Sequence, residues 1–148
     1  MKQVLLPNLR LLSLSSTQGG LDWSELAQKI DHFALENGYE LSEESVFLSY
    51  DRAPAAIEMG EGNCTVSRPV IGPLKELPGD FQLLDWTQKT VFETEIESHS
   101  WDEFWKRSQE VWEELQRRGE KLRPSFMMRL SRRLGPDLTL KTHIYYHV

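Results

Sequence analysis

Apolar side chains recur at helical spacing in two stretches of this chain. Stepping about 100° per residue from Trp23 gathers an apolar arc about 120° wide, and the charged side chains of the stretch fall outside it. The members of the arc are Leu26, Ala27, Ile30, Phe33 and Ala34. The pattern predicts an amphipathic helix that begins at Trp23 behind an Asp22 cap and ends at Gly38.

The second stretch covers residues 101–117 and divides still more sharply. Every position outside its inward arc is charged or carries an amide. The inward positions are Trp101, Phe104, Trp105, Ser108, Val111, Trp112 and Leu115. Ser100 precedes the stretch and Glu103 follows three positions later, which is the spacing of a capping box. We therefore predict a helix that starts after Ser100.

Alternating or continuously apolar runs predict strands in the rest of the chain. These runs are residues 9–15, 45–51, 63–72, 124–131 and 138–148, and residues 81–96 supply one long strand or two shorter ones. Pro69 places its strand at an edge or marks a late end. Residues 52–62 read as a loop, and residues 75–80 and 132–137 as turns.

The sequence shows an internal duplication. A shift of 78 positions lays the two predicted helices on each other, so that Trp23 matches Trp101, and each helix is followed by a glycine and a short strand. The repeat unit is strand, helix, strand, strand. Two such units predict an α+β fold in which one antiparallel sheet carries both helices on one face about a pseudo-twofold axis. We expect one domain over residues 1–148, with half-repeats of about 1–72 and 73–148.

Charge and composition exclude several classes of protein. The net charge is −6, from 23 acidic and 17 basic residues, so we expect no nucleic acid partner. The apolar run at the start of the chain is too short, and too often interrupted by polar residues, to be a signal peptide or a membrane span. A single cysteine, Cys64, excludes an internal disulfide and is expected to act as a small apolar side chain. We expect a cytoplasmic protein that does not bind membranes.

The tryptophan stripe of the second helix has two interpretations. In the matched helices alanine faces tryptophan at two positions, so the tryptophans can fill space in a shared core. The matched pairs are Ala27 with Trp105 and Ala34 with Trp112. Alternatively, part of the stripe lines a cavity. Ser108 favours this second interpretation because a hydroxyl within an apolar stripe is natural beside water or a ligand, although it can also bond its own helix backbone.

Several strings, taken in order, resemble the gyrase-inhibitor-like effector-binding family, which also occurs attached to transcription regulators. The strings are "VFLSYDRAP", "LPGDFQLLDW" and the closing "THIYYHV", and together they span nearly the whole chain. The resemblance implies two strand-helix-strand-strand halves that enclose a groove for hydrophobic, often cationic, compounds. Because the two halves use the whole chain, we expect no DNA-binding helix-turn-helix segment within it.

Two positions depart from the family's pattern. The family places a pocket glutamate and an aromatic residue on the strand after the second helix, and these positions match Met127 and Arg129 here. A strand puts both side chains on one face, so that face has exchanged a negative charge for an apolar group and a positive one. The departures argue against a cationic ligand and leave three alternatives. The groove binds an anionic or neutral ligand, it is filled by the chain's own side chains, or its surface binds a protein partner. Arg123, Arg132 and Arg133 add positive charge nearby, as a solvated turn or as a face for an acidic patch or an anionic ligand.

No catalytic or metal-binding motif stands out. The sequence has four histidines, but no residue pattern indicates the third ligand that a metal site would need. It also has no nucleophile elbow, phosphate-binding loop or His-Glu-x-x-His helix. Some members of the resembled family are thought to hydrolyse bound ligands with the pocket glutamate, and methionine at position 127 argues against that activity. We expect no enzyme activity, no cofactor and no metal.

Two functions follow as hypotheses. The first is a stand-alone domain that binds a hydrophobic small molecule, as a regulator or a sequestering protein. Its predicted ligand-binding residues are Trp105, Ser108, Trp112, Met127, Arg129 and Tyr145. The second is an accessory or immunity-like protein that keeps the fold with a filled groove and binds a protein partner through its acidic helix face and arginine-bearing turn.

Overall fold

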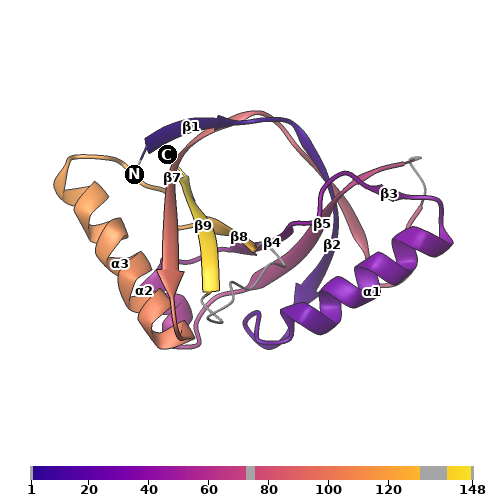
Figure 1. Cartoon of the computed structure of the whole chain (residues 1–148), viewed down its shortest axis with the longest axis horizontal. Coiled ribbons are helices and arrows are strands. Elements are labelled where there is room, and N and C mark those ends of the chain that lie inside the picture. The colour runs from indigo at the N-terminus through magenta and orange to yellow at the C-terminus, as the bar shows by residue number, and fades with distance from the viewer. Residues whose placement is uncertain (1, 73–75, 131–139, 148) are drawn as a thin grey trace.

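A nine-stranded antiparallel sheet forms the centre of the computed structural model, which describes residues 2–72, 76–130 and 140–147 (Figure 1). The strands are β1 (Lys2–Leu6), β2 (Leu9–Ser16), β3 (Glu40–Leu41), β4 (Val46–Tyr50), β5 (Cys64–Ile71), β6 (Gln82–Trp86), β7 (Lys89–Ser98), β8 (Phe126–Leu130) and β9 (Leu140–His147). The helices are α1 (Trp23–Glu36), α2 (Pro54–Glu58) and α3 (Trp101–Arg117). The predicted α+β class is confirmed.

The order of the strands carries the predicted duplication. The sheet runs β1-β7-β9-β8-β4-β5-β2-β6, with β3 paired to β5 beside this path. The units β2-α1-β4-β5 and β7-α3-β8-β9 therefore occupy mirrored places, and β4 pairs with β8 where they meet. Leu48 faces Met128 at the middle of that pairing. The strand-helix-strand-strand repeat predicted from the sequence is thus present as a pseudo-twofold arrangement.

The first strand of each half crosses to the other half. β1 pairs with β7, and β6 pairs with β2, so the two halves exchange arms. The short connections that follow these arms touch each other, since the backbone N–H of Gln88 donates to the Asn8 side chain at 2.6 Å. The sequence did not predict β1, because Pro7, Asn8 and Arg10 interrupt its apolar pattern. Residues 81–96 form two strands, which settles the alternative left open above.

Helices α1 and α3 share one face of the sheet and one hydrophobic core. Ile30 and Ala34 of α1 and Phe104 and Trp112 of α3 belong to the same buried cluster, together with Leu48 at the centre of the sheet. Figure 1 shows the two helices at either end of the curled sheet. A second, smaller cluster fills the opposite face. Its buried members are Leu11, Phe47, Val91, Met127 and Tyr145.

Three local predictions need correction or qualification. Residues 52–62 were expected to form a loop, but α2 lies within them, because Pro54 sets the first turn and the Ala55 N–H donates to the Gln109 side chain on α3 at 2.9 Å. Pro69 lies late in an interior strand rather than at an edge. The expected turn at 132–137 lies outside the described residues. No helix within the described ranges is long and apolar enough to cross a membrane.

Candidate functional site

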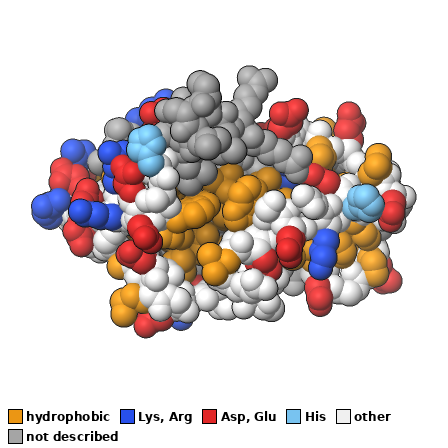
Figure 2. Space-filling model, turned by 60° about the horizontal axis from the view of Figure 1, so that its bottom comes forward, with side chains coloured by type: hydrophobic (Ala, Val, Ile, Leu, Met, Phe, Trp, Pro, Cys, Tyr) orange, Lys and Arg blue, Asp and Glu red, His pale blue; other side chains and the backbone are white. Residues whose placement is uncertain are grey.

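The helix face of the sheet holds a small cavity where α1 and α3 both begin. Its volume is about 110 Å³. Its lining residues, which we call the tryptophan cleft, are Gly19, Gly20, Leu21, Trp23, Leu48, Tyr50, Trp101 and Trp105. Figure 2 shows hydrophobic side chains gathered at the middle of this side of the molecule. The cleft therefore lies close to the pseudo-twofold axis, over the central strand β4.

The duplication places the tryptophans. Trp23 is the first residue of α1 and Trp101 is the first residue of α3, so the repeat brings two equivalent indoles to the same cleft. Trp105 lies one helical turn further and packs edge-on against Tyr50, with ring centroids 5.6 Å apart. Trp101 stacks on Trp105 at 6.4 Å and is 37 % exposed. The cleft thus has one aromatic wall held by the core and one aromatic rim open to solvent.

The α3 end of the cleft is held by the predicted Ser100 cap, with Glu103 bonded to the residue before it. Ser100 accepts a hydrogen bond from the Glu103 backbone N–H at 3.2 Å, and the Glu103 carboxylate accepts one from the His99 N–H at 3.1 Å. These contacts satisfy two backbone donors at the helix start and fix the first turn, which carries Trp101. The predicted cap of the second helix is therefore confirmed.

The α1 end is fixed differently from the prediction. Asp22 does stand at the cap position, but its carboxylate does not cap the helix and instead accepts a hydrogen bond from the Ser16 hydroxyl. Ser16 in turn accepts from the backbone N–H of Gly20 at 2.9 Å. The loop is drawn against the end of β2 by these bonds. A side chain at position 20 is excluded, because a Cβ there would lie 2.8 Å from the Tyr50 hydroxyl and 3.0 Å from the Cys64 sulfur.

The base of the cleft carries no charge at neutral pH. Burial raises the pKa of the Cys64 thiol to about 12, and the nearby Asp22 and Asp51 carboxylates add to the shift while a hydrogen bond with Tyr50 opposes it. Burial also raises the pKa of Tyr50 far above its ordinary value. Cys64 is buried, as its expected role of a small apolar side chain requires. A ligand in the cleft therefore meets apolar and aromatic surface with one neutral hydroxyl beside it.

Ser108 and Trp112 are core residues and do not line the tryptophan cleft. Ser108 is fully buried, and its hydroxyl donates to the Phe104 carbonyl at 2.7 Å, which is the helix-backbone bond considered above. The hydroxyl of Tyr146 donates to the Ser108 carbonyl at 2.9 Å. Trp112 is buried and packs edge-on against Tyr146, with centroids 6.0 Å apart. Of the three predicted residues on α3, only Trp105 lines the tryptophan cleft.

The other three predicted ligand-binding residues lie on the opposite face of the sheet. Met127 pairs with Tyr145 across β8 and β9, and both are fully buried. The Arg129 guanidinium carbon lies 6.0 Å from the Tyr145 ring centroid. Burial raises the pKa of Tyr145 to about 12, with Arg129 opposing the shift and Glu93 adding to it. The six predicted residues thus form two groups, Trp105 with Ser108 and Trp112 on one face and Met127 with Arg129 and Tyr145 on the other.

Two cleft residues that sequence reasoning missed, Trp23 and Tyr50, had a signal in the chain. Trp23 matches Trp101 in the repeat, and a tryptophan at the first position of both helices predicts that the two indoles approach the same axis. Tyr50 ends the central strand β4, directly below that approach. Within the described ranges, no group of three or more histidine, cysteine, aspartate or glutamate side chains is arranged to hold a metal ion.

Comparison with known proteins identifies the fold. No protein-family model matches the chain, and no curated protein matches it in sequence. Among solved structures, the EcmrR C-terminal domain aligns with a TM-score of 0.77 and 10 % identity over 99 % of this chain and 94 % of that domain. EcmrR in its complex with DNA aligns with a TM-score of 0.76 and 11 % identity. That alignment includes 98 % of this chain but only 55 % of the longer EcmrR chain.

A third solved structure is SAV2435 bound to tetraphenylphosphonium. It aligns with a TM-score of 0.57 and 11 % identity over 99 % of this chain and 93 % of SAV2435. At such low identities the likeness concerns the fold alone. The chain therefore shares an architecture with the EcmrR C-terminal domain and with SAV2435.

Proposed function

We propose that this chain is a small-molecule-binding domain of the gyrase-inhibitor-like kind, and that its ligand occupies the tryptophan cleft. The observation that carries the proposal is the convergence of Trp23, Trp101 and Trp105 around a cavity, since a well-packed core leaves few voids of this size. Ligand sites are typically concave and lined by aromatic and apolar groups with few polar ones. The shared fold supports the proposal, because SAV2435 is bound to a hydrophobic compound, tetraphenylphosphonium.

The size of the cleft limits the ligand. A cavity of about 110 Å³ is close to the volume of about 150 Å³ that accommodates benzene in an engineered core, and far below the 300–1,000 Å³ of drug-sized sites. The cleft as it stands accepts one aromatic ring. A larger ligand requires the exposed rim to open, and Trp101 is the side chain free to do so because it lies at the helix start and is only partly covered.

The lining favours an uncharged ligand. None of its residues carries a formal charge at neutral pH, so the lining offers a cation aromatic faces but no carboxylate, and it offers an anion no basic group. The sequence-based argument for an anionic or neutral ligand relied on Arg129, which lies on the other face of the sheet. Neutral ligands remain favoured, now because of the cleft itself.

The same lining supports binding without catalysis. The only ionisable side chain among the lining residues is Tyr50, and its raised pKa makes it a poor base or nucleophile at neutral pH. The buried Cys64 thiol beside it is also held in its protonated form. We therefore propose a non-catalytic domain that acts through the difference in affinity between its ligand-bound and free conformations.

Thermal unfolding with three aromatic probes tests the site and the charge preference. We expect phenol to raise the unfolding temperature more than phenyltrimethylammonium or benzenesulfonate does, since the three probes each carry one aromatic ring and differ in charge. Trp101→Ala should abolish this stabilisation while leaving the fold intact, because Trp101 is partly exposed. Arg129→Gln is the matched control and should leave it unchanged.

Two other outcomes would overturn the proposal. Loss of binding in Arg129→Gln but not in Trp101→Ala would move the site to the opposite face of the sheet. No stabilisation by any probe, together with tryptophans that resist quenching, would indicate a filled groove and favour the alternative function, binding of a protein partner.

A further inference from the structure

The exchanged arms create two open pockets at matching places in the two halves. The first has a volume of about 670 Å³ and lies at the start of β2, beside β6, the end of β5 and the loop before β4. The second has a volume of about 610 Å³ and lies at the start of β7, beside β1, the end of β9 and the loop before β8. Because the pseudo-twofold axis relates their positions, differences between the two pockets show where the halves have diverged.

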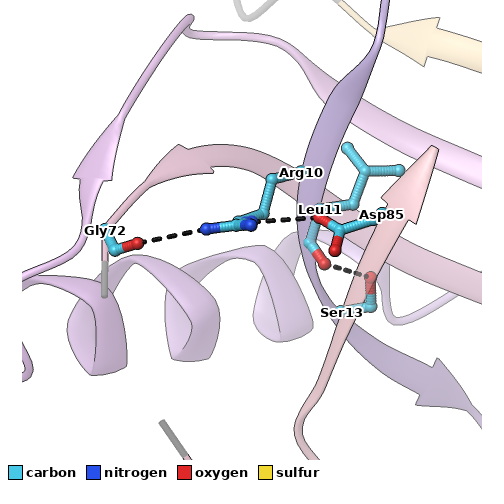
Figure 3. A network of polar contacts seen from close by, with 5 residues as sticks. All are labelled: Arg10, Leu11, Ser13, Gly72 and Asp85. Carbon is cyan, nitrogen blue, oxygen red and sulfur yellow. Dashed lines mark hydrogen bonds and ion pairs between the residues drawn. The ribbon is translucent and has the colours of Figure 1, made fainter. Parts of the chain in front are cut away.

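In the first pocket the positive charge is neutralised by the chain itself. Nε of Arg10 lies 3.0 Å from a carboxylate oxygen of Asp85, its partner across β2 and β6. Nη1 of the same side chain donates to the Gly72 carbonyl at 3.3 Å. Figure 3 shows the guanidinium held between these two groups. An incoming anion would have to displace Asp85.

The second pocket has the opposite balance. Its lining residues, which we call the basic pocket, are Gln3, Thr87, Lys89, Thr90, Arg123 and His147. Two are cations, the other four carry neutral side chains that can donate hydrogen bonds, and none is acidic. Lys89 lies over the Trp86 ring, with its nitrogen 4.6 Å from the centroid. Within the part of the chain that the structure describes, neither Lys89 nor Arg123 has a carboxylate within ion-pair distance.

The pocket is also held in place. The backbone N–H of Arg123 donates to the His147 carbonyl at 2.9 Å, which ties the loop before β8 to the end of β9. Burial, together with the nearby charges of Lys89 and Arg123, lowers the pKa of His147 to about 4, so its ring is neutral at pH 7.

We propose that the basic pocket binds phosphate, either free or as the phosphate group of a larger molecule. A guanidinium offers two parallel donors that match phosphate oxygens, and an ammonium and threonine hydroxyls complete the set. The protein as a whole repels anions, since its net charge is −6, so binding depends on this local cluster. The inference does not depend on the function of the tryptophan cleft.

The test is an NMR titration of the amide signals of Thr87 and Thr90 with sodium phosphate, against sodium chloride at equal ionic strength. We expect saturable shifts with phosphate alone. Lys89→Gln and Arg123→Gln should each raise the dissociation constant for phosphate about tenfold, because each removes a charge-assisted hydrogen bond. Lys121→Gln makes the same change of charge outside the pocket and should have no effect. A parallel titration with phenyl phosphate distinguishes a free anion from a phosphate ester as the preferred form.

A third variant copies the first pocket into the second. Leu5 holds in β1 the place that Asp85 holds in β6, and it pairs with Thr90, which lines the pocket. Leu5 is 58 % exposed, so Leu5→Asp should fold normally. It should weaken phosphate binding at least as much as loss of one cation, whereas Leu5→Ser should not. Equal shifts with chloride, or an unchanged phosphate dissociation constant in a Lys89→Gln/Arg123→Gln double variant, would overturn the proposal.

Discussion

Arg68 is the most completely buried charged side chain among the described residues, and it supports a quantitative prediction about stability. It lies in β5 between Val66 and Val70, which belong to the core under α1. Its Nε lies 3.1 Å from a carboxylate oxygen of Asp31 on α1, and Nη1 donates to the Glu44 carbonyl at 2.8 Å. The side chains are 2 % and 25 % exposed for Arg68 and Asp31 respectively. The pair therefore ties α1 to the sheet.

The difference in exposure makes the two halves of the pair unequal. Asp31→Asn removes a negative charge that faces the buried guanidinium and should cost about 3–5 kcal/mol of unfolding free energy. Arg68→Met should cost less by at least about 1 kcal/mol, because methionine fills the apolar site and the partly exposed Asp31 regains water. With a urea dependence of about 2 kcal/mol per molar, Asp31→Asn should lower the midpoint by about 2 M.

Urea unfolding followed by tryptophan fluorescence measures these differences directly. Arg107→Met is the control, because Arg107 is 51 % exposed and forms an ordinary surface pair with Glu103 at 3.4 Å, so its loss should cost less than about 1 kcal/mol. The reasoning from burial would be refuted if Arg68→Met destabilised the protein as much as Asp31→Asn, or if Arg107→Met matched either of them.

Three further predictions concern groups away from this pair. The Cys64 thiol, buried with a pKa raised to about 12, should resist iodoacetamide at pH 8 in the native protein and react fully in urea, as mass spectrometry can show. Burial raises the pKa of Tyr50, Tyr145 and Tyr146, so the unfolding free energy should be constant below their unfolded-state pKa of about 10 and fall as the pH rises towards 12; a stability that was flat up to pH 12 would contradict this. Deleting residues 1–6 removes β1 and leaves β7 as an open edge, so light scattering should detect self-association absent from the intact chain.

The duplication was the most informative feature of the sequence. The helical spacing at 23–36 and 101–117 was strong enough to predict both helices, because each has a clear apolar arc and a distinct start. The repeat then predicted how the strands are arranged around them. It did not predict the exchange of β1 and β6, since pairing between distant strands leaves no local pattern and β1 carries a broken apolar run. The short helix α2 was missed for a related reason, as a contact with α3 supports it.

The candidate site was harder to predict because a sheet separates side chains that a sequence lists together. Met127 and Arg129 alternate with Phe126 and Met128, and only the latter pair faces the helices. A resemblance that names positions on β8 therefore does not bring them to the helix stripe. Ser108 was ambiguous from the start, since a helical serine can satisfy its own hydroxyl, and that bond forms here.

The divergence between the halves is more informative about function than their similarity. A duplicated fold can preserve its packing with equivalent residues in both halves, so an inequality at matched places needs its own cause. At the tryptophan cleft the repeat supplies Trp23 and Trp101 alike, but the position of Trp105 is matched by the smaller Ala27, and only Trp105 lines the cavity. At the exchanged arms, Arg10 is neutralised by Asp85, whereas the matched pair in the other half, Thr90 and Leu5, carries no charge. The basic pocket beside that pair holds Lys89 and Arg123 and no acid in its lining. An exposed cation adds little to stability, so folding alone does not account for the two cations of the basic pocket. Trp105 and the basic pocket both lie at openings to solvent, which is where ligands can reach them.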